Sequence, residues 1–305
     1  MIPSIKHRLA SLLFLALAVT SALAQEKVTA DDILQRHLDS IGTSTVRTAA
    51  KTRVVEAKAS YRVLLGGTPV QYDGKAVMVS GGNKLHMLLK INAPQYTGER
   101  FIRDGDKTSV EATYANKTRS ELGTLLQADD TPIREGLIGG VLNTAWPLFD
   151  LGSHKGKIQY QGLKRIDGTD LHVVRYQPGK NTGFEITLYF DPQTLRHVRT
   201  VYLEDRATGI TTSPFRDTVA PPSRRNPERL NGPDARSARL GPTWWRIEEQ
   251  FGNFMTIDGL TLPTHYDLRF QRQLPSRSIQ TIEWDVTTTR VLSNVSVDSR
   301  NFQIH

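Results

Sequence analysis

An alternation of apolar and polar residues with a period of two runs through most of this chain, and it restricts the possible folds more than any other feature. In residues 55–65 the apolar positions start at Val55 and recur at every second residue to Leu65, with polar residues such as Glu56 and Arg62 between them. Successive side chains of a strand point to opposite faces, so the pattern predicts strands with one buried and one solvated face. The same period recurs between residues 75 and 113, 157 and 204, and 244 and 291.

The turns between these segments indicate that neighbouring strands are antiparallel. Asp-Gly pairs, which favour two-residue hairpin turns, occur at residues 73–74, 104–105, 167–168 and 258–259. Connections this short leave no room for parallel crossovers. We therefore expect a mainly β protein, a curved antiparallel sheet or incomplete β-barrel of about ten to eleven strands, formed by residues 25–305 as a single domain. A short amphipathic helix at Thr29–Ile41, with Thr29 and Asp32 at capping-box spacing, is expected to dock on that sheet.

Residues 131–151 depart from the period of two. Apolar residues recur there at steps of three and four from Ile133 to Phe149, and Pro132 after Thr131 is a favourable start for a helix. The glycines at 136, 139 and 140 together lower helix stability by roughly 2–3 kcal/mol relative to alanine. Burial of six or more large apolar side chains, at about 1.5–3 kcal/mol each, would outweigh that cost. We therefore predict a central helix in or across the curved sheet, with glycines that would let it shift as a lid.

The first 24 residues have the pattern of a secretory signal peptide. Lys6 and Arg8 precede an apolar run at 12–19, and Ala22-Leu23-Ala24 has the small-x-small form of a cleavage site. No later stretch reaches the uninterrupted apolar length of about 18 residues that suggests a membrane span. We therefore expect an exported, periplasmic protein without an integral membrane span. The chain contains no cysteine, which excludes disulfides and thiol catalysis.

The basic charge of the chain does not indicate a nucleic-acid partner. The formal net charge is +8, or +6 once Lys6 and Arg8 are removed, and Lys and Arg are scattered along polar strand faces. Residues 205–242 are rich in proline and arginine and poor in large apolar residues, so we expect a disordered insertion loop between two strands. An arm that binds a partner is the alternative interpretation of this loop.

No motif for catalysis or metal binding stands out. The histidines after residue 24 are scattered, without an H-x-x-x-H or H-x-H pair, so we expect neither a metal nor another cofactor. A G-x-S-x-G elbow is absent, and Ser80-Gly81-Gly82 fits a hairpin turn better than a nucleophile. The chain is expected not to be an enzyme, although a Ser-His-Asp arrangement assembled from distant residues stays open as an alternative.

Seven segments carry a resemblance to a known family. They are the opening helix at 33–41, the strand at 54–63, GKAVMVSGGNKLHMLLKI at 74–91, FIRDGDKTSV at 101–110, the segment opened by Thr131-Pro132, ITLYFDPQTLRHV at 186–198 and MTIDGLTLP at 255–263. In this order they resemble the LolA/LolB-like superfamily of periplasmic lipoprotein carriers. The resemblance implies an incomplete antiparallel barrel with helices as a lid over a hydrophobic groove for acyl chains. Where the lipoprotein carrier has a basic residue and a proline after its second strand, this chain has Ser80, Gly81 and Gly82.

The residues expected to line such a groove are apolar and lie on the inner side of the strands or on the central segment. They are Tyr61, Met87, Leu89, Phe101, Ile133, Leu137, Val141, Trp146, Phe190, Tyr266 and Phe270. Filling of an ordinary core explains any one of them equally well. Many strands around one short helix favour a groove, and so we predict a periplasmic carrier or binding protein for lipoprotein acyl chains or a related amphiphile. The alternative is an envelope sensor or assembly partner that uses the same fold to bind a protein.

Overall fold

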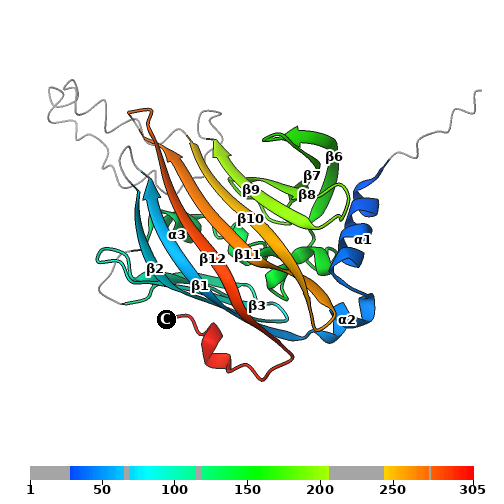
Figure 1. Cartoon of the computed structure of the whole chain (residues 1–305), viewed down its shortest axis with the longest axis horizontal. Coiled ribbons are helices and arrows are strands. Elements are labelled where there is room, and N and C mark those ends of the chain that lie inside the picture. The colour runs from blue at the N-terminus through cyan, green and yellow to red at the C-terminus, as the bar shows by residue number, and fades with distance from the viewer. Residues whose placement is uncertain (1–27, 65–68, 115–118, 206–243, 275) are drawn as a thin grey trace, which may run out of the picture.

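The computed structural model describes residues 28–64, 69–114, 119–205, 244–274 and 276–305, and its main element is one twelve-stranded antiparallel sheet (Figure 1). The expected signal peptide and nearly all of the expected insertion loop lie outside these residues. The strands are β1 (Thr52–Leu64), β2 (Val70–Gly81), β3 (Lys84–Ile91), β4 (Gly98–Asp104), β5 (Lys107–Ala112), β6 (Lys157–Ile166), β7 (Thr169–Gln177), β8 (Glu185–Phe190), β9 (His197–Asp205), β10 (Trp244–Ile257), β11 (Leu260–Gln273) and β12 (Ile279–Ser293).

The strand order is β5-β4-β3-β2-β1-β12-β11-β10-β9-β8-β7-β6, and every pair is antiparallel. Neighbouring strands of the sheet are consecutive in the chain except at the centre, where β1 pairs with β12 and Tyr61 lies opposite Trp284. The edge strands β5 and β6 do not pair with each other, so the sheet is open. The mainly β, antiparallel and incomplete character expected from the sequence is confirmed, with one or two strands more than expected.

Most of the Asp-Gly hairpin turns occur where the sequence predicts them. Asp258 and Gly259, which join β10 to β11, both have positive φ angles, 51° and 77°, as the two central residues of a type I′ turn require. Asp167 and Gly168 do the same between β6 and β7, at 49° and 84°. The pair at residues 73–74 is an exception, because it lies within β2 rather than in a turn. The period-two pattern of β2 continues through that pair, and strand pairing with β1 and β3 outweighs its turn preference.

Helices are short and lie at the ends and over one face of the sheet. They are α1 (Ala30–Ile41), α2 (Ser44–Ala49), α3 (Glu121–Ala128) and α4 (Thr131–Arg134), with 3-10 turns at Gly140–Leu142, Pro147–Phe149 and Ser299–Phe302. The predicted capping box of α1 is present, because Thr29 Oγ1 accepts the Asp32 N–H and Asp32 accepts the Thr29 N–H at 2.8 Å. The buried face of α1 contains Ile33, Ile41 and also His37.

The connection between β5 and β6 determines what covers the sheet. It starts at one edge strand and ends at the opposite one, so it has to cross the whole width of the sheet, and it lies behind β10 to β12 in Figure 1. We call residues 131–151 of this connection the covering segment. The predicted continuous helix is wrong here: the segment contains one helical turn, α4, and two 3-10 turns. Its side chains and the inner face of the sheet form one hydrophobic cluster.

Candidate functional site

All eleven residues predicted to line a groove lie in the hydrophobic cluster between the sheet and the covering segment. Each is at most 8% exposed, and none lines the two surface cavities described below. The sheet contributes seven of them, and Ile133, Leu137, Val141 and Trp146 come from the covering segment itself. The structure therefore brings the predicted residues together, but its own side chains cover that inner face.

The glycines of the covering segment serve a different purpose from the predicted one. Gly139 has a φ of +78°, a left-handed conformation that ends the helical period, and a Cβ at this position would lie 2.3 Å from Cε of Met78. Gly136 also has a left-handed backbone conformation, with a φ of +72°. The glycines thus allow a tight turn and close packing on β2, and they do not sit in a helix that could slide as a unit.

Glu249 holds the covering segment at its centre. This residue points inward from β10, and its Oε1 accepts hydrogen bonds from the Gly139 N–H at 2.6 Å and the Tyr266 hydroxyl at 2.9 Å. Its Oε2 accepts the Tyr202 hydroxyl at 2.6 Å. Burial raises the pKa of Glu249 to about 7, although all three hydrogen bonds act in the opposite direction by favouring the carboxylate. The carboxyl group therefore changes charge near neutral pH.

Further polar contacts hold the second half of the covering segment. Arg53 on β1 is buried and donates from Nη1 to the Val141 carbonyl at 2.6 Å, and burial lowers the pKa of its guanidinium to about 10. Ser80 Oγ accepts the Thr144 N–H at 3.0 Å. Within the segment, Asn143 donates from Nδ2 to the carbonyls of Gly136 and Ile138. Sheet and segment are thus joined by directed hydrogen bonds as well as by apolar contact.

Two buried histidines, His37 on α1 and His197 on β9, both contact Trp146 of the covering segment. His37 Nδ1 lies 3.0 Å from the Leu195 carbonyl, so the imidazole donates there, and its Nε2 accepts Trp146 Nε1–H at 3.5 Å. His197 stacks on Trp146 with ring centroids 4.8 Å apart, and its Nε2 lies 2.9 Å from Thr200 Oγ1. Burial lowers the pKa of His37 to about 4 and that of His197 well below its usual value. Both imidazoles are therefore neutral at pH 7.

A cavity of about 600 Å³ opens at the end of this covered region, between α1, α2 and the covering segment. Its apolar wall includes Leu38, Phe149 and Leu260, and its basic wall includes Arg47, Lys51 and Arg53. Arg47 is fixed by donating to the carbonyls of Leu38, at 2.7 Å, and Gly42. Cavities of roughly 300–1,000 Å³ accommodate small organic ligands. Apolar surface beside several cations suits a molecule with a hydrocarbon part and an anionic part.

Sequence reasoning missed the polar residues of this region, although part of the signal was present. Trp245, Ile247 and Phe251 alternate toward the inner face of β10, and Glu249 has the same parity, which marks it as a buried acid. His37 lies between the apolar positions of α1 and was not distinguished from an exposed histidine. Within the described part of the chain, the side chains of His265, Asp267 and Asp285 form a group that could hold a metal ion, on the opposite face of the sheet. No pair of histidines at a fixed spacing marks this group in the sequence, because its three residues come from two strands.

Fold and site together define an open antiparallel sheet whose concave face is covered by the link between its edges. No family model and no curated protein matches the sequence. Solved structures with a similar arrangement include a DUF1329 family protein from Desulfovibrio piger, at 14% identity and a TM-score of 0.46 over 90% of this chain and 96% of that one. A putative outer membrane lipoprotein-sorting protein domain from Vibrio parahaemolyticus has 8% identity and a TM-score of 0.43, with 88% and 97% covered.

A third similar structure is the lipoprotein LppX of Mycobacterium tuberculosis, at 16% identity and a TM-score of 0.22, with 57% of this chain and 88% of that one covered. At these identities the likenesses concern the fold alone. Over the residues that the structure describes, no helix combines the length and the apolar character needed to cross a bilayer.

Proposed function

We propose that the protein is a periplasmic carrier or binding protein for the acyl chains of lipoproteins or a related lipid. The cavity of about 600 Å³ between α1, α2 and the covering segment is the observation that supports this function most directly. An acyl chain would enter along Leu38, Phe149 and Leu260, and an anionic headgroup would lie near Arg47 and Lys51. Burial of each methylene group contributes about 0.8 kcal/mol, which is enough for binding without covalent chemistry.

The eleven residues predicted from the sequence would form a second, deeper part of this binding site. They become accessible only if the covering segment moves away from the sheet, which requires its hydrogen bonds to Glu249, Arg53 and Ser80 to break. In this proposal the cavity binds lipid first, and longer chains bind deeper as the covering segment is displaced. Release follows when the segment returns, because the segment and the lipid compete for the same apolar surface.

The test starts with the purified chain lacking residues 1–24. We expect mass spectrometry of an organic extract to find copurified lipid, and a fluorescent fatty acid to bind the delipidated protein. Phe149→Asp, which places a charge in the cavity wall, should weaken probe binding at least about tenfold, since a charge in an apolar site is strongly unfavourable. Leu163→Asp is the matched control, because Leu163 is a 53% exposed apolar residue on β6.

Both variants must retain the circular dichroism spectrum of the parent protein. Absence of both copurified lipid and probe binding would contradict the carrier function. Equal loss of binding in Phe149→Asp and Leu163→Asp would contradict the assignment of the cavity. Periplasmic location is tested separately by cell fractionation of the full chain and of a chain without residues 1–24.

A further inference from the structure

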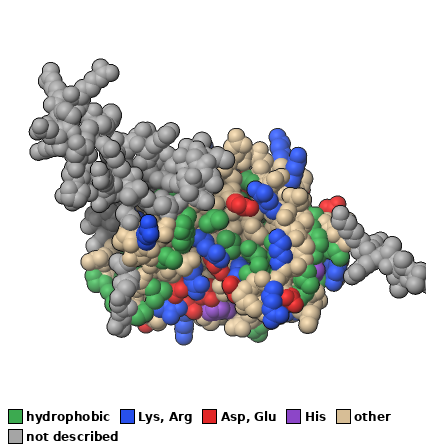
Figure 2. Space-filling view, turned by 90° about the horizontal axis from the view of Figure 1, so that it is seen from above, with side chains coloured by type: hydrophobic (Ala, Val, Ile, Leu, Met, Phe, Trp, Pro, Cys, Tyr) green, Lys and Arg blue, Asp and Glu red, His purple; other side chains and the backbone are tan. Residues whose placement is uncertain are grey.

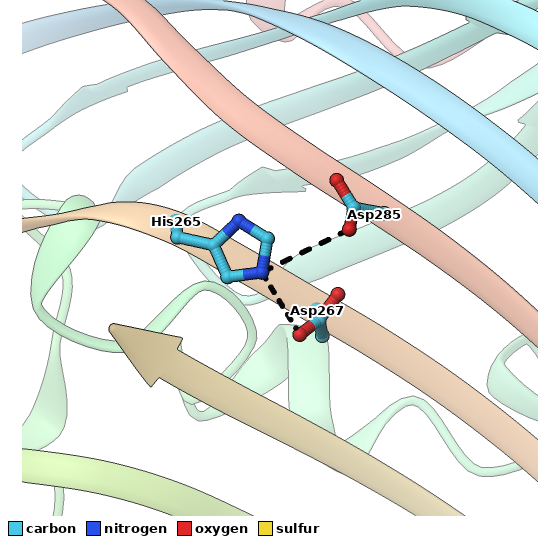
Figure 3. Close-up of side chains that lie close together, drawn as sticks. All are labelled: His265, Asp267 and Asp285. Atoms are coloured by element: carbon cyan, nitrogen blue, oxygen red, sulfur yellow. Dashed lines mark hydrogen bonds and ion pairs between the residues drawn. The ribbon is translucent and has the colours of Figure 1, made fainter. Parts of the chain in front are cut away.

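The convex face of the sheet carries a group of three side chains that the carrier function does not use. His265 and Asp267 lie two residues apart on β11 and so point to the same side of that strand, and Asp285 lies on β12 directly opposite Asp267 (Figure 3). His265 Nε2 is 3.1 Å from Oδ2 of Asp267 and 3.8 Å from Oδ2 of Asp285. One donor atom from each residue lies within 4.8 Å of the other two.

These distances match the separations of ligands around one small metal ion. Two ligand atoms that each lie about 2.1 Å from an ion are about 3.0–3.4 Å apart at octahedral or tetrahedral angles. The 3.1 Å separation lies within that range, and the 3.8 Å separation exceeds it by about 0.4 Å, which a rotation of the Asp285 side chain can supply. Since the three residues sit on paired strands, their backbones are already fixed in place.

The local charge also points to a cation. Two other carboxylates on this face are paired with arginine: Glu283 with Arg62 and Arg269, and Glu248 with Arg199 and Arg246. Asp267 and Asp285 form ion pairs only with His265 among the described residues. Like charges directly opposite each other on paired strands are unfavourable, so this pair of aspartates needs a positive charge between them.

Basic and acidic side chains are otherwise interspersed over the surface that Figure 2 shows. Arg269, the basic residue next along β11 on this face, donates from Nε to Glu283 at 2.7 Å, and its charge also acts on Asp267.

The group is accessible to solutes from a cavity of about 350 Å³. His265 and Asp267 form part of its wall, and Asp167 and Asp191 lie on the wall as well. The residue opposite His265 on β10 is Gly252, and a Cβ there would meet no atom within 4 Å. A missing side chain at this position leaves room for an ion with its water molecules or a further ligand.

We propose that His265, Asp267 and Asp285 bind a divalent transition-metal ion, with Zn²⁺ as the reference ion. One imidazole nitrogen and two carboxylate oxygens suit zinc or manganese, whereas Ca²⁺ prefers six to eight oxygen ligands. Three protein ligands leave at least one coordination position open toward the cavity. This site is on the opposite face of the sheet from the lipid cavity, and the proposal does not depend on the carrier function.

Isothermal titration calorimetry on the full mature chain, dialysed first against EDTA, tests the site. We expect one equivalent of Zn²⁺ to bind at pH 7.5 and Ca²⁺ to give no measurable heat. His265→Gln and Asp285→Asn should each lower the Zn²⁺ affinity at least about 10-fold, because a lost ligand costs no less than a lost outer-shell partner. Glu283→Gln is the matched control on the same face of β12, since Glu283 is paired with arginine, and it should bind Zn²⁺ as the parent does.

A thermal melt provides a second readout. Zn²⁺ should raise the melting temperature of the parent and of Glu283→Gln, and leave those of His265→Gln and Asp285→Asn unchanged. The three substituted residues are partly exposed, so folding of each variant can be verified by circular dichroism. Failure of the parent to bind Zn²⁺ would overturn the proposal. So would equal Zn²⁺ affinity in all four proteins, which would place the ion at other histidines.

Discussion

At the scale of single residues, protonation of Glu249 makes the stability of the folded protein depend on pH. A carboxyl group whose pKa is raised from 4.5 to about 7 in the folded protein binds more protons in the native than in the unfolded state between these values. Its contribution to stability is therefore fully present below pH 4.5 and is lost as the pH rises through 7. Over this range the loss amounts to about 3 kcal/mol.

Glu249→Gln removes this titration while retaining an oxygen that can accept the Gly139 N–H. We expect the free energy of unfolding of the parent, measured in urea and taken relative to that of Glu249→Gln, to decrease steadily from pH 5 to pH 8. Taking the difference cancels the contribution of His37, whose lowered pKa gives the opposite slope below pH 6.5. Glu283→Gln, on the convex face, serves as control. If the unfolding free energies of the parent and of Glu249→Gln changed in parallel with pH, burial would not raise the pKa of Glu249.

Substitutions at Gly139 and Gly82 separate two contributions to stability, that of the left-handed backbone conformation and that of close packing. Gly139→Ala places a side chain at a φ of +78° and also drives Cβ into Met78. Gly82→Ala is a matched control with a φ of +58° and no atom within 4 Å. We expect Gly82→Ala to cost about 1 kcal/mol of unfolding free energy and Gly139→Ala about 1–3 kcal/mol more, as judged by urea denaturation. Equal costs would mean that Met78 moves aside freely.

At the scale of elements, the capping box of α1 stabilises one wall of the lipid cavity. Thr29→Ala removes the side-chain acceptor for the Asp32 N–H and should lower the free energy of unfolding by about 1 kcal/mol. Thr43→Ala, at the start of the shorter α2, removes a longer hydrogen bond of 3.4 Å and should cost less. Chemical denaturation of both variants measures the difference. A larger effect at Thr43 would show that α2, not α1, is the element that depends on its cap.

At the scale of the whole molecule, β9 and β10 form an antiparallel pair in which Asp205 lies opposite Trp244. The two ends of the intervening residues are therefore adjacent, and a two-residue turn can replace residues 206–243 without altering the register of the sheet. We expect the shortened protein to melt cooperatively and to retain binding of the fatty-acid probe. If the protein instead acts as an envelope sensor through this loop, the shortened chain would lose a protein partner in a pull-down while still folding.

The sheet could be predicted from the sequence because alternating residues such as those of Val55–Val63 report directly on a face that is buried and a face that is not. The cap of α1 was predictable for a similar reason, since Thr29 and Asp32 act locally. The covering segment was not, because its residues are buried on nearly every side. When residues are buried on nearly every side, apolar residues at steps of three and four do not distinguish a helix from turns. The glycines at 136 and 139 adopt left-handed backbone conformations, which end the helix after one turn.

In the candidate sites, too, contacts between residues close in the sequence could be predicted, and contacts between distant residues could not. His265 and Asp267 share a strand face, which the sequence alone indicates, but Asp285 joins them only through the register of β11 and β12. The contact between Glu249 and the Gly139 amide spans 110 residues and depends on which edges of the sheet are connected. Neither could be derived without the strand order.

The sheet can finish folding only after β1 has paired with β12. All other neighbouring strands are consecutive in the chain, so each hairpin can form as soon as its second strand has been synthesised. Only the central seam joins the first strand to the last, with Val55 opposite Val291. Until the C-terminal strand has joined the sheet, both β1 and β11 have open edges that can pair with other chains. Chains cut short before Ile279 should therefore aggregate, and intact chains should fold slowly, at a rate limited by bringing their two ends together.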